Sequence, residues 1–479
     1  MIATNIEHSG LLYQQIAYTI EHQIISEVLR IGDKIPSIRT ICRDHGVSMS
    51  TALQAYFELE RKGLIESRPQ SGYYVSYAHH KFLPIPRSTQ PKAMCCNEDT
   101  EELIDTVMKE MNNKNMTVFS LGVPAPELLP IAKLNKAMVQ SMRELPGSGT
   151  FYEDIQGNEN LRRQIARLSF NWNGKLKEED VITTAGCMNA ISYCMMALTS
   201  RGDTIAVESP VFFGILQLAK SLGLKVLEIA TNPKTGVELD ALKKAISTKK
   251  IKLCLLVTNF QNPLGFSMPD EHKKAVVELL EANNIPLIED DCYGDVYFET
   301  HRPKNCKTFD ESGNVLLCSS VSKTVAPGYR VGWVSPGKYK EQVMRLKLYH
   351  SISAPTLPQA VIGNFLETGR YDNHLRKLRH TLYTNSLQYL RCIKEYFPKD
   401  TKLSRPQGGF MLWVELNKSI DTVEIFDKAL RQNITIAPGK MFTLQKQYNN
   451  CMRLSYGIPW NEKVEGSIKT LGKILKSHS

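Results

Sequence analysis

The sequence predicts an α/β protein in which a small helical module precedes a larger domain built on a mostly parallel sheet. Apolar residues recur every four positions near the N-terminus, as they do on the buried face of a helix. Between residues 64 and 77 the period changes to two, which indicates a pair of strands. Beyond residue 180, short apolar runs alternate with helix-length segments, a pattern typical of parallel strands covered by helices on both faces.

Length and composition indicate a globular protein with more than one domain. The 479 residues are too many for one ordinary domain of roughly 150 residues. Hydrophobic residues make up 42% and charged residues 23%, and no apolar run approaches the roughly 20 residues that span a bilayer. Residues 1–8 lack the basic start and apolar core of an export signal. We therefore expect a cytoplasmic protein without a membrane contact.

The cysteines and the charge of the chain bear on its redox state, on metal binding and on nucleic-acid binding. Eleven cysteines lie between Cys42 and Cys451 without a Cys-x-x-Cys pair, so we expect reduced thiols and no bound metal. The net charge is +10, yet the first eighty residues hold seven Lys and Arg against eight Asp and Glu. Charge alone therefore does not identify a nucleic-acid-binding region, and local pattern must do so.

The N-terminal residues predict three helices. A first helix begins at Leu11 and ends near Gly32, and a second runs from Ile38 to His45 and stops at Gly46. Ser48 is a plausible N-cap for a third helix. The buried face of the first helix should comprise Ile16, Ile20, Ile24 and Val28, and that of the third Ala52, Ala55, Tyr56 and Leu59. Short helices joined by such a brief turn form a helix-turn-helix.

A hairpin is predicted to follow the helices. The alternating segments are Leu64 to Ser67 and Tyr73 to Tyr77, joined by the turn residues Arg68 to Gly72. A hairpin after a helix-turn-helix is called a wing. The pattern thus predicts a winged helix-turn-helix over residues 1–78.

Four spaced blocks in this region resemble the winged helix of GntR-type bacterial transcription factors. The blocks are Leu12-Tyr13-Gln14-Gln15-Ile16, Gly32-Asp33-Lys34-Ile35-Pro36-Ser37-Ile38-Arg39, Gly46-Val47-Ser48 and Ala55-Tyr56. The resemblance implies that the third helix enters the major groove of double-stranded DNA and that the wing touches the backbone. The DNA-binding residues it implies are Ser37, Arg39, Ser48, Ser50, Thr51 and Gly72. Met49 stands where the family commonly has a basic residue. The alternative is a three-helix module that contacts protein.

A linker is expected at residues 79–100. Pro84, Pro86 and Pro91 are spread among polar residues without a usable period, which is typical of an extended connection. The remainder, residues 101–479, is expected to form the second domain. Its strands are predicted at Val181–Thr184, Thr204–Val207, Lys225–Ile229, Lys252–Thr258, Ile285–Ile288 and Val315–Leu317.

Chemistry is concentrated where these strands end. The strand at Val315 runs into hydroxyl residues, then Lys323 and Arg330. A lysine can form a Schiff base with an aldehyde, and hydroxyls with a guanidinium can hold a phosphate, so this stretch suits pyridoxal 5'-phosphate (PLP). By itself it could also be a loop with a solvated lysine. Since the carboxyl ends of parallel strands meet at one edge, the other strand ends should lie nearby.

Residues 117–460 resemble the fold-type I aminotransferases. Asp290 of the Glu-Asp-Asp-x-Tyr block is followed by Lys323 thirty-three residues later, and Arg330 is seven beyond that. The resemblance implies a PLP-dependent transferase fold, in which helices sandwich a mostly parallel sheet, with a smaller C-terminal α+β subdomain. It also implies that Lys323 is the catalytic residue that binds PLP covalently and that Asp290 pairs with the pyridine nitrogen.

The same resemblance assigns the other contacts. Tyr293 and Asn262 would hold the phenolic oxygen and Phe212 would stack on the ring. The phosphate would be bound by Ser320, Arg330 and the backbone N–H groups of Cys187 and Met188. Arg453 would hold a substrate or effector carboxylate, and Tyr152 would reach the site from a partner subunit, which implies a homodimer. The subunits would exchange DNA-reading domains or such active-site residues.

A GntR-type winged helix joined to an aminotransferase-like domain is similar to the MocR subfamily of transcription regulators. This resemblance implies a PLP-dependent switch, in which the cofactor or its adduct with an amino acid or amine changes DNA binding. Two alternatives stay open: an authentic amino-acid aminotransferase that uses 2-oxoglutarate, and a binding module that uses PLP only as a structural brace.

Overall fold

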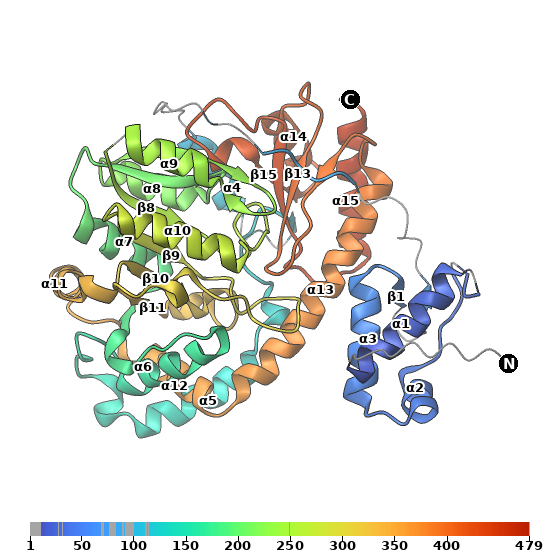
Figure 1. The fold of residues 1–479 in the computed structure, drawn as a ribbon, viewed down its shortest axis with the longest axis horizontal. Coiled ribbons are helices and arrows are strands. Elements are labelled where there is room, and N and C mark those ends of the chain that lie inside the picture. The colour runs from blue at the N-terminus through green and yellow to red at the C-terminus, as the bar shows by residue number, and fades with distance from the viewer. Residues whose placement is uncertain are drawn as a thin grey trace. The chain divides into compact units, whose positions relative to one another are not determined.

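The N-terminal part of the chain forms the predicted helices and hairpin. The computed structural model describes residues 11–26, 28–30, 32–68, 71–75, 83–88, 91, 100–110, 113, 115–248 and 250–478. The chain divides into two compact units, Met1–Leu83 and Pro84–Ser479. The first contains α1 (Leu12–Ile25), α2 (Ile38–His45), α3 (Met49–Arg61), β1 (Ile65–Arg68) and β2 (Gly72–Val75), as Figure 1 shows. The winged helix-turn-helix is therefore confirmed.

Local chemistry explains where these helices begin and end. Ser37 Oγ accepts a hydrogen bond from Thr40 N at 3.1 Å, and Ser48 Oγ accepts one from Thr51 N at 3.2 Å, so each serine caps a helix. Gly46 ends α2 in the left-handed conformation with φ of 63°. A core closes over them, made of Ile16, Ala17, Ile20, Ile35, Ile41, Ala52, Ala55, Tyr56, Leu59, Leu64, Ile65 and Val75.

One prediction for the first helix was wrong. The helix ends at Ile25, and the Ser26 hydroxyl donates to the His22 carbonyl at 2.6 Å. Val28 therefore lies beyond the helix and its residue surface is 69% exposed rather than buried. The four-residue spacing of apolar residues continues by chance past the end of the helix. The predicted helix was therefore too long.

The second unit is built on an eight-stranded sheet. Its strand order is β4-β11-β10-β9-β8-β5-β6-β7, and only β11 and β7 run antiparallel to their neighbours. The strands are β4 (Ile182–Thr184), β5 (Thr204–Ser209), β6 (Lys225–Asn232), β7 (Gly236–Val237), β8 (Ile251–Leu256), β9 (Leu287–Asp290), β10 (Val315–Ser320) and β11 (Gly332–Ser335). The predicted mostly parallel sheet is confirmed.

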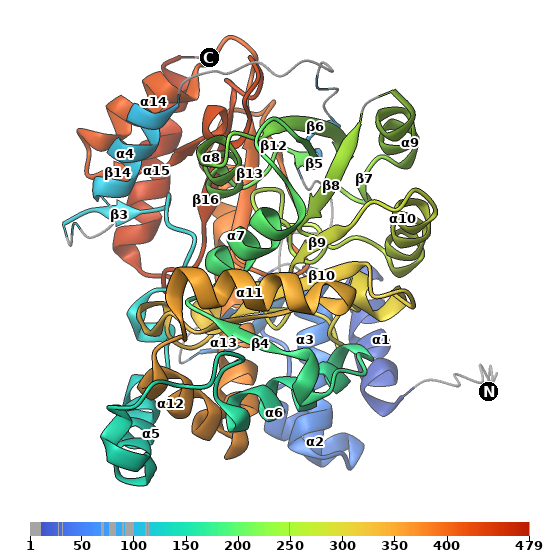
Figure 2. The ribbon, with the colours of Figure 1, turned by 90° about the vertical axis from the view of Figure 1, so that its left-hand side faces the viewer.

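Helices cover both faces of this sheet. In Figure 2, α7 (Cys187–Leu198) and α8 (Phe213–Ser221) lie on one side, and α9 (Leu239–Thr248) and α10 (Asp270–Ala282) on the other. A second helical group packs together near one end of the unit and comprises α5 (Ile131–Glu144), α6 (Glu159–Leu168) and α12 (Thr356–Glu367). Helix α11 (Lys340–Ser351) packs on α7.

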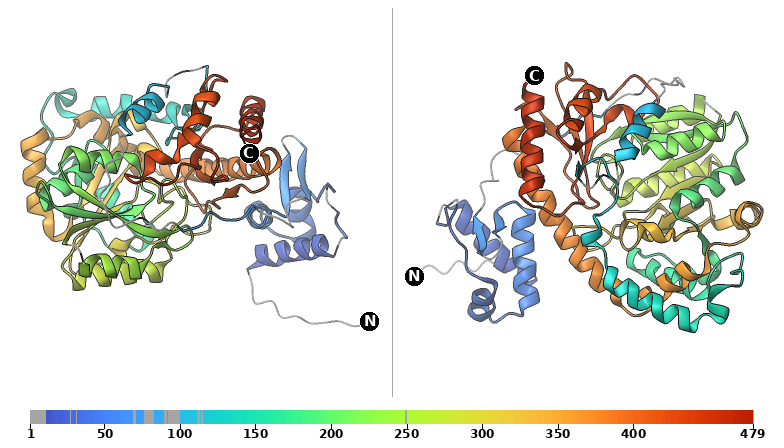
Figure 3. Two further views of the ribbon diagram at one scale, coloured as in Figure 1. Left: turned by 90° about the horizontal axis from the view of Figure 1, so that it is seen from above. Right: turned by 180° about the vertical axis from the view of Figure 1, so that it is seen from behind.

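A smaller subdomain completes the second unit. Its four-stranded sheet has the order β12-β13-β16-β15 and is antiparallel throughout. The strands are β12 (Lys402–Leu403), β13 (Met411–Glu415), β15 (Ala437–Pro438) and β16 (Cys451–Ser455). Helix α13 (Arg370–Tyr396) runs from α12 to α15 (Glu462–Lys476), as Figures 1 and 3 show, and α14 (Thr422–Leu430) also packs on α15. The predicted α+β subdomain is thus present.

The chain enters the second unit through the smaller subdomain. Leu403 N donates to Pro84 O at 2.9 Å, and Arg87 N donates to a Glu415 carboxylate oxygen at 3.0 Å. After α4 (Glu101–Lys109), strand β3 (Thr117–Val118) pairs with β14 (Ile434–Thr435). The expected linker at 79–100 lies largely outside the described residues. In the described part of the chain, no helix is both long and apolar enough to cross a membrane.

Candidate functional site

A cavity of about 120 Å³ lies where the carboxyl ends of the parallel strands meet. All nine residues predicted to bind the cofactor line it. The complete lining is Cys187, Met188, Phe212, Val257, Asn262, Asp290, Cys292, Tyr293, Ser320, Ser322, Lys323 and Arg330. These side chains come from segments separated by up to 143 residues, and the strand order of the sheet brings them together.

Lys323 stands at the end of a short 3-10 turn, Val321–Lys323, directly after β10. Its Nζ donates a hydrogen bond of 2.6 Å to the carbonyl of Gly122 and lies 5.6 Å from the centre of the Tyr293 ring. Burial lowers the pKa of the Lys323 amine, an effect that nearby Cys292 and Asp290 partly oppose. A lower pKa leaves more of the amine unprotonated, which is the form that attacks an aldehyde.

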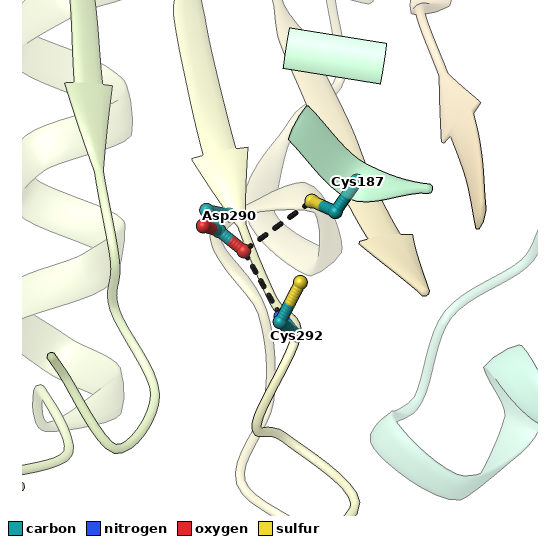
Figure 4. Close-up of side chains that lie close together, drawn as sticks. All are labelled: Cys187, Asp290 and Cys292. Carbon is teal, nitrogen blue, oxygen red and sulfur yellow. Dashed lines mark hydrogen bonds between the residues drawn. The ribbon is translucent and has the colours of Figure 1, made fainter. Parts of the chain in front are cut away.

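Asp290 is the last residue of β9 and lies buried in the wall of the cavity. Its Oδ1 accepts hydrogen bonds from Cys292 N at 3.1 Å and from Cys187 Sγ at 3.5 Å (Figure 4). Burial raises the pKa of the Asp290 carboxyl. A cation placed against it, such as a protonated ring nitrogen, would offset the cost of burying the carboxylate.

Tyr293, Asn262 and Arg453 form a chain of hydrogen bonds. Asn262 Nδ2 donates to Tyr293 Oη at 3.3 Å, and Arg453 Nη1 donates to Asn262 Oδ1 at 2.9 Å. Arg453 Nη2 donates to the carbonyl of Ser120. Burial lowers the pKa of Arg453 to about 10. The structure therefore places Arg453 beside the predicted cofactor residues, as a buried cation.

The opposite end of the cavity suits an anion. Helix α7 begins at Cys187, so the N–H groups of Cys187 and Met188 belong to its first turn, where backbone donors lack partners within the helix. Arg330 donates to Ser322 Oγ at 3.4 Å and to Ala185 O at 3.1 Å. Gly186 has φ of 96°, and a Cβ there would collide with the Arg330 guanidinium, so glycine is required.

Some residues that line the cavity or bind its side chains were not predicted from the sequence. Cys292, Ser322 and Val257 line the cavity beside the predicted residues, and Gly122 and Ser120 bind the predicted lysine and arginine through their carbonyls. A main-chain carbonyl carries no signal in residue type, so only tertiary structure could show the last two. Ser322, by contrast, lies next to Lys323 in sequence and its hydroxyl could have been considered.

Of the predicted site residues of this unit, Arg453 and Tyr152 do not line the cavity. Arg453 bonds to Asn262, which does line it, whereas Tyr152 lies on the surface. It is 83% exposed, and the neighbouring Phe151 is 69% exposed. Its role as a residue that reaches a partner subunit's site is a prediction that a single chain does not test.

The predicted DNA contacts lie on the surface of the first unit. Ser37, Arg39, Ser48, Ser50 and Gly72 are exposed and Thr51 is half-buried. Ser48 Oγ lies 2.8 Å from Ser50 Oγ and 2.9 Å from Thr51 Oγ1, so these three hydroxyls cluster at the start of α3.

Two cations at the wing are not among the predicted DNA-binding residues. Arg68 lies over the Tyr74 ring at 4.3 Å and Lys34 at 5.9 Å, next to Gly72. Arg68 also pairs with Glu66 at 2.9 Å, so part of the positive charge on this face is neutralised locally.

Comparison with known proteins agrees with both units. Residues 12–75 match the gntR family of bacterial regulatory proteins, and residues 116–465 match the class I and II aminotransferases. The HTH-type transcriptional regulator YjiR of Escherichia coli is 36% identical over 97% of this chain and 98% of its own length. NorG of Staphylococcus aureus, also an HTH-type transcriptional regulator, is 26% identical over 92% of this chain and 99% of its own.

Solved structures resemble the second unit. The multiple substrate aminotransferase of Thermococcus profundus is 25% identical and has a TM-score of 0.74 over 80% of this chain and 96% of its own. LysN, an α-aminoadipate aminotransferase of Thermus thermophilus solved with N-(5'-phosphopyridoxyl)-L-leucine, is 26% identical, with a TM-score of 0.72 over 78% of this chain and 94% of its own.

The fold and the cavity define a class of protein: a DNA-binding transcription regulator whose second unit is an aminotransferase domain. This chain belongs to the class I and II aminotransferase family and, through its GntR-type winged helix, to the MocR type of regulator. Its cofactor is PLP. The residues fit that group, because the cavity offers an amine with a lowered pKa, a buried carboxylate and a guanidinium beside a helix N-terminus.

Proposed function

We propose that this regulator senses an amino acid at its PLP site and changes its binding to DNA in response. The observation that carries the proposal is the buried guanidinium of Arg453. It is 2% exposed, and within the described residues its Nε has no hydrogen-bond partner and no carboxylate is paired with it. A buried unpaired cation is costly, and a ligand carboxylate would relieve that cost.

Residues of the cavity would hold the cofactor in a defined orientation. Lys323 would bind its aldehyde, Asp290 its ring nitrogen, and Tyr293 with Asn262 its phenolic oxygen. Ser320, Arg330 and the first turn of α7 would bind its phosphate, and Phe212 would cover the ring. PLP, when bound, supplies an aldehyde that joins covalently to amino groups. Arg453 would then select amino compounds that also carry a carboxylate.

The segment Phe119–Gly122 connects both ligand-binding groups. The Gly122 carbonyl accepts from Lys323 and the Ser120 carbonyl from Arg453. Phe119 O accepts from Ser455 N of β16 at 2.8 Å. An amino acid that engages Lys323 and Arg453 would therefore loosen two bonds that hold one segment. Such a ligand shifts DNA binding only if it binds two arrangements of the protein unequally.

The experiment compares amino acids with the amines formed by removing their carboxylate. Wild-type protein loaded with PLP is titrated with each member of such pairs while the visible absorption band and DNA binding are recorded. The amino acid should act at lower concentration, and Arg453→Met should abolish the difference while leaving the band. Equal responses to both members of every pair would overturn the role of Arg453.

A homodimer is the expected assembly. Tyr152 and Phe151 expose aromatic surface that one chain leaves uncovered. We propose that Tyr152 reaches the partner subunit's cavity. Mass measurement in solution combined with Tyr152→Ala tests this, because the variant should lose ligand response while its aldehyde site remains intact.

Transamination is the second candidate function, and the complete cavity favours it. The Lys323 amine, whose pKa is lowered by burial, could move a proton in the site, and Asp290 would keep the ring nitrogen charged. Fast turnover of an amino acid with 2-oxoglutarate by protein that binds no DNA at low salt would make the enzyme reading the better one. A third possibility, PLP as a structural brace, requires that no amino compound change the band.

A further inference from the structure

Two thiols meet the carboxylate of Asp290 inside the cavity. Cys187 begins α7, and Cys292 follows β9 by two residues, so the groups arrive from segments about one hundred residues apart. Figure 4 shows both sulfur atoms on the same side of the Asp290 carboxylate. One ligand atom from each residue lies within 4.8 Å of the others, and all three residues are buried.

Three such groups within this distance could serve as the protein ligands of a metal ion. Zinc binds thiolate sulfur at about 2.3 Å and carboxylate oxygen at about 2.0 Å, so two such ligands on a tetrahedral ion lie roughly 3.5 Å apart. Cys187 Sγ and Asp290 Oδ1 are 3.5 Å apart. Two thiolates with one carboxylate favour a zinc-like cation over magnesium or calcium, which prefer oxygen ligands.

An ion could reach this site and complete its coordination there. All three residues line the 120 Å³ cavity, and Ser320 Oγ, which also lines it, lies 3.6 Å from Cys292 Sγ. A serine hydroxyl or a water could take the fourth position of a tetrahedral ion. Among the described residues, the other buried thiols do not line the cavity: Cys194, Cys254, Cys306, Cys318, Cys392 and Cys451. Access from the cavity therefore distinguishes Cys187 and Cys292 from cysteines that only fill the core.

We propose that the protein without PLP binds Zn²⁺ through Cys187, Asp290 and Cys292, and that Zn²⁺ and PLP exclude one another. The exclusion rests on the proposed contact between Asp290 and the ring nitrogen, because an ion and a ring that are both held at this carboxylate would share one cavity of about 120 Å³. The Zn²⁺ site itself rests only on the three ligand groups. The proposal differs from the expectation of no bound metal, which came from cysteine spacing and stays a prediction. A zinc-loaded regulator would be unable to answer its amino-acid ligand, so the site would make the PLP response sensitive to metal.

Cobalt is the probe for this site, because tetrahedral Co²⁺ bound to thiolates absorbs in the near ultraviolet and the visible. Full-length protein is freed of PLP under reducing conditions and titrated with Co²⁺. We expect one ion per chain with a thiolate charge-transfer band that Zn²⁺ removes. Cys187→Ser and Cys292→Ser should each weaken binding by about ten-fold or more, since even outer-shell partners are worth that much. Cys254→Ala, which changes a buried thiol outside the cavity, should leave the band unchanged.

The outcomes separate the two parts of the proposal. A missing thiolate band, or an equal band in the Cys187→Ser/Cys292→Ser double variant, would overturn the metal site. A circular dichroism spectrum that matches the wild type shows that these variants are folded. Displacement of Co²⁺ by added PLP supports the exclusion. Simultaneous binding of both would overturn the exclusion and the role of Asp290 toward the ring, while the metal site would stand.

Discussion

The Arg453 guanidinium and the Asn262 side chain are joined by a hydrogen bond of 2.9 Å between Nη1 and Oδ1. Asn262 in turn donates to the Tyr293 hydroxyl at 3.3 Å. The group proposed to grip a ligand carboxylate is therefore held by the same amide that is proposed to face the cofactor. We therefore expect the occupancy of one position to affect the orientation of the other.

Asn262→Ala should uncouple these positions. The substitution leaves Arg453 Nη1 buried without its acceptor, and a lost hydrogen bond to a charged group costs about 1.5–3 kcal/mol. We expect amino-acid affinity, measured on the visible band, to fall by about ten-fold or more. The response to the matching decarboxylated amines should change less, because they do not use Arg453. An equal loss for both would contradict the coupling.

Lys323→Ala should remove the visible band of lysine-bound PLP. Its amine lies in the cavity, and burial lowers its pKa, so it is the nucleophile available there. Absorption spectra of PLP-saturated protein give the readout, and borohydride reduction with peptide mapping identifies the modified residue. Lys338→Ala, on the surface, serves as the control. A wild type that stays colourless when saturated with PLP would contradict this assignment.

Arg39→Ala should weaken binding to DNA from upstream of the protein's own gene. Loss of one phosphate contact lowers the slope of log affinity against log salt by about 0.9. Arg43→Ala is a matched control, because Arg43 lies on the same helix but pairs with Asp44 at 3.0 Å. Affinities measured at several salt concentrations decide the point. Unchanged slopes in both variants would show that Arg39 does not contact a DNA phosphate. The visible absorption band of PLP should be the same in both variants as in the wild type.

The recognition helix α3 should read thymine methyl groups. Met49 is 54% exposed and Leu53 42%, one helical turn apart on the same face. Apolar side chains in the major groove contact the C5 methyl of thymine, and burying one methyl is worth about 0.8 kcal/mol. Replacing a contacted thymine by uracil should thus weaken binding about four-fold. The effect should vanish in Met49→Ala/Leu53→Ala and persist in Val28→Ala, which alters an exposed residue outside α3.

Glu60 should make the winged helix less stable as pH rises. It is 2% exposed, accepts a hydrogen bond from Ser67 N at 3.1 Å, and burial raises its pKa to about 7. An unfolded glutamate has a pKa of about 4.3, so the folded state binds the proton more tightly. The stability gained from this proton is present below about pH 4 and is lost as pH rises to about 7.

Glu60→Gln keeps an acceptor for Ser67 and removes the charge. At pH 7.5 we expect hydrogen exchange in α3 to be slower in the variant than in the wild type. The difference should correspond to an increase in the free energy of unfolding of up to about 3 kcal/mol. Wild type and variant are compared at the same pH, so intrinsic exchange rates cancel. Glu58→Gln, a less buried position on α3, is the control. Faster exchange in Glu60→Gln would show that the carboxylate is stabilising.

The sequence predicted the cavity more fully than it predicted the surfaces. Asp290 ends a strand, Asn262 and Lys323 come soon after one, and parallel strands in one sheet have their carboxyl ends at a common edge, so their convergence was predictable. The antiparallel strand β11 (Gly332–Ser335) was not predicted. It is only four residues long, and its hydrophobicity does not distinguish it from a loop after Arg330.

Contacts made by backbone atoms and by distant segments could not be predicted. Gly122 meets Lys323 through a carbonyl, which every residue type possesses. Cys187 and Cys292 meet only because β4 and β9 belong to one sheet, so their spacing in sequence resembles no metal motif. Val28 is a case in which the sequence predicted a feature that the structure lacks. The regular spacing of apolar residues continued beyond the end of the helix, so Val28 was predicted to be buried.

Pro84 and Arg87 bond to the smaller subdomain well before the chain reaches the aminotransferase sheet. A chain shortened to begin at Thr117 would match the aminotransferases in length but would lose both attachments. One that begins at Pro84 would retain them together with every cavity residue. Ligand sensing and DNA reading should therefore be separable at residue 84, and removal of the first 83 residues should leave a protein that still binds PLP.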